Sequence, residues 1–473
     1  MARRVQIAAV EQPEIAAAFA ELRESVGVTI GFTAEVLADA EAAARAPRLP
    51  ERDETAIPFV TIDPAESQDL DQALHVERRD SGFRVRYAIA DVAAFVTPED
   101  PMDVEAHARG QTLYAPDADA LLYPPAISHD AASLVDGETR PAVLWTIDLD
   151  AEGRTAEVDV ARALVRSRRK LSYDDVQGAL DAGAADEPLE LLREVGTLLQ
   201  RLEAERGGVD LQIPEQEIER GPHGYELSFR TQLPIERWNA QISLLTGRAA
   251  ATLMLNAKIG IVRTLPRADD GAVARLRRTA AALGVPWPQA MTYADFVRSL
   301  DPADTHHQAV LVESTILLRG SGYAAFDGAE PEHARHEGVA APYAHATAPL
   351  RRLVDRYVSE VCLAVHAGRE VPDWAREALP ALPETMARSS QCASQYEAGV
   401  VSTVEAALLE RSVGREFEAV VVELDRDGKG GTVQLTQPAV TAHAKGDLPL
   451  GERVRVRLTL ADVAKRQVRF ELA

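Results

Sequence analysis

The chain has 473 residues, 46% of them hydrophobic, which is long enough for two or three domains and a substantial core. No run of 18 or more apolar residues indicates a membrane span, so we expect no membrane partner. The formal net charge of −23 argues against binding nucleic acid through a generally basic surface, because phosphates attract Lys and Arg. A strand of nucleic acid could be held only by local basic groups.

The N-terminus and the cysteines bear on the compartment. Residues 1–6 carry two arginines but lack the hydrophobic core and cleavage site of a signal peptide. The two cysteines, Cys362 and Cys392, lie far apart and lack metal-ligand spacing. We therefore expect a reducing, cytoplasmic location and interpret both thiols as helix-packing groups.

The first two hundred residues combine helical and strand patterns. Residues 1–54 are mixed and partly helical, and 33–45 predict a helix with Thr33 as a possible N-cap. From 55 to about 165 the pattern predicts strands, with apolar residues alternating through 83–89 after a turn at 80–82. Residues 187–206 predict an amphipathic helix that stops at two glycines.

The remaining chain divides into a helical part and a strand part. Helices are expected to dominate residues 235–410. Residues 417–422, 454–458 and 468–472 alternate, and the turn residues of 425–431 separate the first two runs. This pattern predicts a small five-strand β-barrel, with a β-cap packed on the core as the alternative. The fold class is therefore α+β.

An acidic cluster follows the first predicted strand. The apolar run 57–62 ends in Asp63, Pro64 breaks the strand, and Asp69 and Asp71 follow. Three carboxylates this close repel one another unless a cation holds them. Mg²⁺ takes oxygen ligands of this kind and keeps open positions for water and a substrate phosphate. The cluster predicts a metal site, and a solvated acidic loop is the alternative.

Residues 61–75, TIDPAESQDLDQALH, resemble the catalytic signature of the RNB exoribonucleases, the ribonuclease II and ribonuclease R family. Further motifs that resemble the family follow in order at 86–96, 114–116, 122–125, 128–134 and 343–356. The resemblance implies an RNB catalytic domain over 55–410 and a reduced S1/OB-like domain over 411–473. The family's two N-terminal cold-shock domains are not expected, because residues 1–54 cannot hold two OB barrels.

The resemblance also implies a site and a reaction. Asp63, Asp69 and Asp71 would bind or orient two Mg²⁺ ions, or Mn²⁺, to hydrolyse single-stranded RNA from its 3′ end into nucleoside 5′-monophosphates. Arg351 matches an arginine that contacts the scissile phosphate. Tyr114 matches an aromatic residue that stacks on the 3′-terminal base, and a half-buried core tyrosine is the alternative.

Further RNA contacts are implied with open alternatives. Arg352 is a second RNA-contacting candidate, and a structural salt bridge is its alternative. Glu397 matches a glutamate near the scissile end of the RNA, and a plain surface glutamate is its alternative. Basic groups for the RNA strand are expected from the run that contains Arg335, His336, His345, Arg351, Arg352 and Arg356. The sequence does not predict a protein partner.

Two positions depart from the family pattern. Gln72 stands where the family has a fourth aspartate, and its neutral carbonyl oxygen can ligate a metal without adding charge. Gln241, after Ala240, stands where the family usually has paired glutamates, in a nucleotide-contacting position. Two hypotheses therefore remain: an active exoribonuclease, or a catalytically impaired RNB-fold protein that binds RNA 3′ ends.

Overall fold

The structure is a computed structural model that describes residues 12–473 except 210, 212, 222–223 and 436. The basic N-terminal residues 1–6 lie outside this part. Two helices precede the first barrel, α1 (Gln12–Val26) and α2 (Ala34–Arg45). The Thr33 side chain accepts a hydrogen bond from the Val36 backbone N–H at 3.3 Å, so the predicted N-cap is confirmed.

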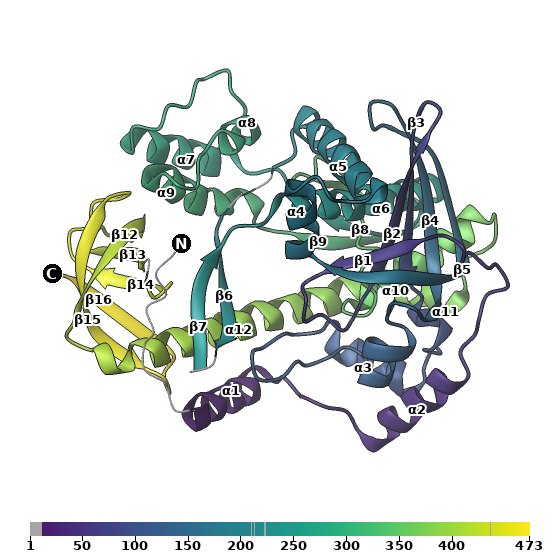
Figure 1. Cartoon of the computed structure of the whole chain (residues 1–473). Helices are drawn as coiled ribbons and strands as arrows, with labels where there is room; N and C mark the ends of the chain where they lie inside the picture. The colour runs from purple at the N-terminus through teal and green to yellow at the C-terminus, as the bar shows by residue number, and fades with distance from the viewer. Residues whose placement is uncertain (1–11, 210, 212, 222–223, 436) are drawn as a thin grey trace.

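A closed five-strand barrel forms the first half of the molecule, at the right of Figure 1. Its strands are β1 (Phe59–Asp63), β2 (Gln72–Arg79), β3 (Gly82–Ala90), β4 (Thr139–Asp150) and β5 (Thr155–Ser172). Neighbouring strands are antiparallel except β1 and β5, which pair in parallel and close the barrel. In β3 the predicted alternation is confirmed, because Phe83, Val85 and Tyr87 are buried.

The predicted run of strands is interrupted between β3 and β4. A 3₁₀ turn covers Val92–Ala94, helix α3 covers Pro101–Arg109, and a π-helical turn covers Ala126–Ala131. Asp100 caps α3 by accepting a hydrogen bond from the Asp103 backbone N–H, and Pro101 occupies the first turn. Local capping chemistry therefore produces a helix where the sequence pattern predicted strands.

Helices pack around this barrel and extend away from it. They are α4 (Tyr173–Asp181), α5 (Glu187–Arg206), α6 (Pro234–Ala257), α7 (Asp270–Ala282), α8 (Tyr293–Arg298), α9 (Thr305–Ser314), α10 (Leu353–His366), α11 (Asp373–Ala378) and α12 (Leu382–Leu409). Three short antiparallel pairs lie among them: β6 (Glu215–Gly221) with β7 (Gly224–Arg230), β8 (Ile259–Thr264) with β9 (Gly322–Asp327), and β10 (Arg335–His336) with β11 (Ala341–Pro342). The predicted α5 is confirmed, and it ends at Gly207 in the left-handed region with φ 86°.

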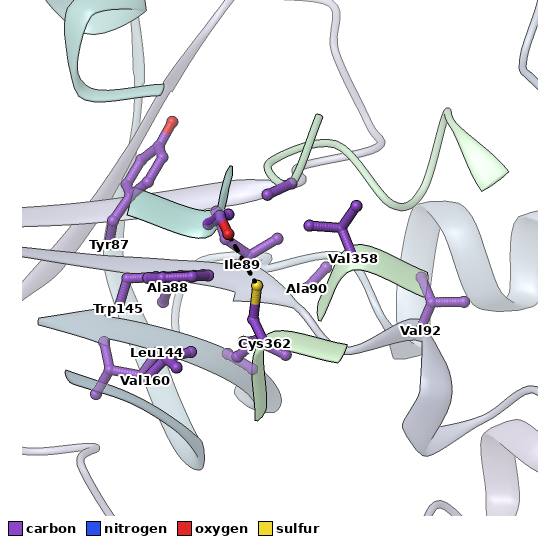
Figure 2. Packing of buried hydrophobic residues seen from close by; sticks show 14 of the residues in the cluster. Tyr87, Ala88, Ile89, Ala90, Val92, Leu144, Trp145, Val160, Val358 and Cys362 are labelled. Carbon is purple, nitrogen blue, oxygen red and sulfur yellow. Dashed lines mark hydrogen bonds between the residues drawn. The ribbon is translucent and has the colours of Figure 1, made fainter. Parts of the chain in front are cut away.

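The main core lies between the barrel and α10. Figure 2 shows Cys362 of α10 among side chains of β3, β4 and β5, with Trp145 and Ile89 close by. The Cys362 thiol is buried and donates to the Ala250 carbonyl at 3.7 Å. Cys392 of α12 donates to the Val26 carbonyl at 3.6 Å. Both thiols therefore pack between elements, as predicted.

A second closed barrel forms the C-terminal part, at the left of Figure 1. Its strands are β12 (Glu416–Leu424), β13 (Gly430–Leu435), β14 (Thr441–Lys445), β15 (Arg453–Asp462) and β16 (Gln467–Leu472), in the order β12-β13-β14-β16-β15. The predicted five-strand barrel is confirmed, and the α+β class with it. Within the described residues, no helix is both long and apolar enough to cross a membrane.

Candidate active site

The acidic loop after β1 is held by side chains from elsewhere in the barrel. Lys170 Nζ donates to the carbonyls of Ala65 and Ser67 at 2.8 and 2.6 Å. The Ser133 hydroxyl donates to the Gln68 carbonyl at 2.7 Å and accepts from the Leu70 N–H at 2.9 Å. The loop that presents Asp69 and Asp71 is thus fixed at several backbone points.

Asp71 joins this loop to the segment before α10. Its side chain is 2% exposed; Oδ1 accepts from the Leu350 N–H at 2.8 Å, and Oδ2 accepts from Arg351 Nε at 3.2 Å. Arg351 remains 45% exposed at its side chain. Its two terminal nitrogens have no hydrogen bond to any described residue, so they are open to a ligand such as a phosphate.

Tyr114 lies on the same site. Its hydroxyl donates to Asp69 Oδ2 at 2.6 Å, and the residue is 44% exposed. The residue is therefore partly exposed while its hydroxyl is anchored, and its role in stacking stays a prediction. An exposed ring fixed at one end is suited to stacking against a base.

Burial sets the protonation of the two most enclosed carboxyls. It raises the pKa of Asp63 to about 6, with Asp69 adding to the effect and Arg351 and Lys170 opposing it. It raises the pKa of Asp71 to about 8, partly offset by Arg351 and the Leu350 N–H. Both shifts show that negative charge here is costly without a compensating cation.

The donor set partly fits a hard divalent cation. Asp63 Oδ2 is buried and has no hydrogen-bond partner among the described residues, which is the environment of an oxygen that a cation would satisfy. In the described chain, however, no three His, Cys, Asp or Glu side chains already form a metal-binding group. Instead, Asp69 accepts a hydrogen bond from the Tyr114 hydroxyl, and Asp71 accepts hydrogen bonds from the Leu350 N–H and Arg351. Asp63, Asp69 and Asp71 could hold a metal after a local rearrangement.

Gln72 bridges the barrel and the segment before α10. Its Nε2 donates to the Thr347 carbonyl at 2.5 Å, and its Oε1 accepts from the Tyr87 hydroxyl at 3.3 Å. An aspartate could not donate to a carbonyl oxygen. The glutamine therefore has a structural use in this chain, and its role as a metal ligand stays a prediction.

The other RNA-contact candidates form no hydrogen bond with Asp63, Asp69 or Asp71. Gln241 is buried on α6, donates to Glu203 Oε2 at 2.7 Å and lines a cavity of about 450 Å³. Arg352 forms two hydrogen bonds with Asp355 at 2.9 and 2.8 Å, which is the salt-bridge alternative. Glu397 is exposed on α12. Contact of these residues with RNA stays a prediction.

The expected basic run is largely internal. Arg356 is 2% exposed and paired with Asp103. Burial lowers the pKa of His336 to about 4 and that of His345 well below its ordinary value, so both are neutral near pH 7. The expectation that these three residues supply charge to an RNA strand is therefore wrong. Arg356 is buried in an ion pair with Asp103, and burial keeps His336 and His345 neutral.

Sequence reasoning missed several residues that shape the site. Asn239 of α6 donates to the carbonyl of Ile62 and to the Tyr173 hydroxyl, each at 3.3 Å. Its Oδ1 is buried without a hydrogen-bond partner among the described residues. The signal was present, because Asn239 is a polar residue between Ile235 and Ile242 on the buried face of α6. Ser133 lies within the 128–134 family motif, whereas Lys170 gave no comparable signal.

Comparison with known proteins places this site in a family. The RNB domain model matches residues 51–367, and the model of the RNase II-type exonuclease C-terminal S1 domain matches residues 415–473. The chain belongs to the RNB family, as its motifs indicated, and its C-terminal barrel is an S1 domain of the RNase II type.

Several curated relatives are named ribonuclease R. The chain is 26% identical over 440 residues to Ribonuclease R 1 of Lactococcus lactis, covering 86% of this chain and 52% of that protein. It is 26% identical over 461 residues to Ribonuclease R of Aquifex aeolicus, and the match covers 87% of this chain and 63% of that protein. The chain thus spans between half and two thirds of the length of these relatives.

Solved structures share the fold at low identity. Mycoplasma genitalium RNase R in complex with ribose methylated single-stranded RNA has a TM-score of 0.86 at 19% identity, covering 97% of this chain and 78% of that one. Yeast Ssd1, a pseudonuclease, has a TM-score of 0.70 at 16% identity, and the match covers 97% of this chain and 58% of Ssd1. Because a ribonuclease and a pseudonuclease share this fold, the fold alone does not decide catalysis.

Proposed function

We propose that this chain is a metal-dependent, hydrolytic 3′-to-5′ exoribonuclease that acts on single-stranded RNA and releases nucleoside 5′-monophosphates. The observation that carries the proposal is the position of Arg351. Its half-exposed guanidinium is held by Asp71, within electrostatic range of Asp63 and Tyr114. Carboxylates for cations, an arginine for phosphate and an aromatic ring for a base therefore occur in one site of an RNB domain.

Two Mg²⁺ ions, or Mn²⁺, are the proposed cofactors, held by Asp63, Asp69 and Asp71. When bound, such ions supply a nucleophilic water and stabilise the leaving oxygen of a phosphodiester. The buried, unpartnered Asp63 Oδ2 supports their binding. The raised pKa of Asp63 and of Asp71 also supports it, because a cation would stabilise both carboxylates in their ionised form.

The remaining roles belong to the protein's own side chains. Arg351 places its open terminal nitrogens on the scissile phosphate, where negative charge builds during hydrolysis. Tyr114 stacks on the 3′-terminal base while Asp69 holds its hydroxyl. Stacking tolerates every base, which suits an enzyme without sequence preference.

A second function has one specific observation in its favour. Both oxygens of Asp71 and both ends of Gln72 already bind protein groups, so these polar atoms have partners that do not require a metal. A protein that binds RNA 3′ ends without cleaving them would need Arg351 and Tyr114 but no cations. The two functions differ in whether any metal concentration produces cleavage.

The test is a time course with 5′-labelled single-stranded RNA and Mg²⁺ or Mn²⁺, comparing the wild type with Asp71→Asn. We expect the wild type to shorten the RNA from its 3′ end. The variant should lose on the order of 100-fold or more in rate, since it removes a proposed metal-binding carboxylate and an acceptor of Arg351, while Tyr114 stays in place to bind RNA. Cleavage by the variant within about tenfold of the wild type would remove Asp71 from the site. Intact binding without cleavage by the wild type would establish the second function.

A further inference from the structure

We infer that helix α1 is part of the RNA site, and that Arg23 is a positioning residue for the loop that carries Tyr114. This loop, residues 113–120, is called the Tyr114 loop below. The inference rests on the proposed function, because it assigns Tyr114 the role of stacking on the terminal base. It goes further by giving a segment outside the RNB match, which begins at residue 51, a part in recognition.

The Tyr114 loop is closed at its base and braced inside. Leu113 and Ala120 exchange backbone hydrogen bonds, at 3.0 Å from the Leu113 N–H and 2.8 Å from the Ala120 N–H. Asp119 Oδ1 accepts from the Ala115 N–H at 3.1 Å. A short loop tied at these points moves as a unit, so a force on one residue is transmitted to Tyr114.

Arg23 of α1 forms an ion pair with Asp117 of this loop. Its Nη1 lies 3.0 and 2.9 Å from the two carboxylate oxygens of Asp117, and it donates to the Tyr396 hydroxyl of α12 at 3.3 Å. The side chains of Arg23 and Asp117 are only 15% and 20% exposed. Water screens such a pair less than an exposed one, so the pair can hold a preferred position.

An apolar contact supports the ion pair. Ile15, Phe19 and Leu22 of α1 belong to one buried cluster with Leu113 and Ala120 at the base of the loop, together with Tyr396 and Val400 of α12. Figure 1 shows α1 lying beside α12. Helix α1 therefore contributes to the apolar cluster at the base of the loop and also binds the loop through the Arg23–Asp117 ion pair.

On its other side the same loop reaches the acidic cluster. Tyr114 donates to Asp69 at 2.6 Å, so a single loop links Arg23 to a proposed metal ligand. Without Arg23, the loop would open more often at its Leu113–Ala120 base and lose a fixed position relative to α12. We expect the Tyr114 ring to spend less time where a base can stack on it, which weakens RNA binding.

The binding test uses the full chain, a fluorescein-labelled 12-nucleotide oligoadenylate and EDTA, which prevents metal-dependent cleavage. Arg23→Gln should weaken binding about 3- to 10-fold, at or below the lower end of the loss for one base stack, because the Tyr114 ring is still present. In a Tyr114→Ala background, Arg23→Gln should cause no further loss, because both changes act through the same ring. Arg45→Gln, which removes an exposed pair with Glu41 on α2, is the control and should bind as the wild type.

Hydrogen exchange gives a readout that does not depend on RNA. Arg23→Gln should speed hydrogen exchange of the Leu113 and Ala120 amides at least tenfold. The double variant Arg23→Asp with Asp117→Arg, which swaps the two charges, should restore slow hydrogen exchange. Unchanged exchange in Arg23→Gln, or an equal loss of affinity with and without Tyr114, would overturn the inference. If Tyr114→Ala binds RNA as the wild type does, the stacking role fails and α1 has no part in the RNA site, and the exchange result then decides only whether Arg23 positions the loop.

Discussion

Gln72 shows how one side chain can be read in two ways. As a replacement for an acidic residue it removes a negative charge from a metal site, which the sequence pattern emphasises. In the structure its amide connects Tyr87 of β3 to the Thr347 carbonyl, and an amide can make both bonds because it carries a donor and an acceptor. The departure from the family pattern is therefore compatible with an intact site.

Gln72→Glu tests the structural use of this amide. The carboxylate keeps the length of the side chain but cannot donate, so it would face the Thr347 carbonyl without a hydrogen bond. We expect a loss of about 1–3 kcal/mol in the free energy of unfolding, seen as a lower thermal midpoint. An unchanged midpoint combined with a lower Mg²⁺ requirement for cleavage would instead identify position 72 as a metal ligand.

Arg351→Ala separates a transition-state contact from a simple phosphate anchor. A guanidinium aimed at charge that develops during hydrolysis should lower kcat by about 100-fold or more and change KM by less than about tenfold. Steady-state kinetics on single-stranded RNA measure both constants. Arg376→Ala, at an exposed arginine of α11 paired with Asp327, serves as the control. Equal losses in kcat and in affinity would assign Arg351 to binding alone.

At the scale of elements, α6 carries the segment that presents Arg351. The Ala344 N–H donates to the Gly247 carbonyl at 3.0 Å, so helix and segment lie in direct contact. A Cβ at Gly247 would lie 2.5 Å from the Ala344 oxygen and still closer to Cε2 of Tyr343. Glycine is required here because the backbone of the segment crosses the helix too closely for any side chain.

Gly247→Ala should therefore displace the segment. We expect it to cost about 1–3 kcal/mol of stability, because a buried backbone contact must open, and to lower cleavage as Arg351 moves. Gly178→Ala in α4 is the matched control, since nothing lies within 4 Å of its Cβ position. That change should stabilise the protein by up to about 1 kcal/mol through helix propensity. Thermal melting of both variants gives the comparison, and a Gly247→Ala protein as stable as the control would contradict the packing argument.

The elements that were predicted correctly have local signals. Helix α2 has its cap at Thr33, α5 has its apolar stripe and terminal glycines, and the C-terminal strands alternate. In contrast, α3 lies in a stretch whose hydrophobic pattern resembled strands, and only its end signals distinguish it: the cap at Asp100, Pro101 in the first turn and Gly110 after the last. An element is predicted correctly when its capping residues and its hydrophobic pattern indicate the same structure. It is missed when the two signals indicate different structures.

The sequence motifs named residues that the structure brings into contact, but they did not predict the bonds between them. The aspartates, Tyr114 and Arg351 were identified from motifs, whereas the bond between Asp71 and Arg351 joins residues 280 positions apart. Burial also determines which basic residues carry charge, and His345 and Arg356 show that this depends on the packed fold. Contacts between distant segments leave no periodic signal in the chain.

At the scale of the whole molecule, α12 connects the two barrels. It runs from the helices beside the first barrel to the C-terminal barrel in Figure 1. Near its end, buried Glu405 accepts from the Gln216 side chain of β6 and from the Thr441 N–H of β14, both at 2.8 Å. One carboxylate thus joins the long helix, the β6–β7 hairpin and the C-terminal barrel.

The position of Glu405 predicts a pH dependence of stability. Burial raises its pKa above the ordinary value of 4.5, against the effect of its two hydrogen bonds. A raised pKa in the folded state means that stability from this group is greatest below 4.5 and is lost as pH rises through the raised value. Glu405→Gln removes this titration, so the variant should gain stability relative to the wild type as pH rises from 4.5 toward neutral.

Thermal midpoints at several pH values measure this difference. Glu410→Gln, at an exposed position just beyond α12, controls for the loss of one negative charge. A constant difference between Glu405→Gln and the wild type across this range would show that Glu405 keeps the same protonation state in the folded and unfolded chain.

The central claim is that the site hydrolyses RNA, and the most direct measurement follows oxygen from solvent into the product. Single-stranded RNA is incubated with the wild type and with Asp63→Asn in ¹⁸O-water containing Mg²⁺ or Mn²⁺, and released nucleotides are weighed by mass spectrometry. We expect wild-type nucleoside 5′-monophosphates with one ¹⁸O in the phosphate, and a loss on the order of 100-fold or more in Asp63→Asn. Bound RNA that releases no nucleotide, or nucleotides without the label, would contradict the claim.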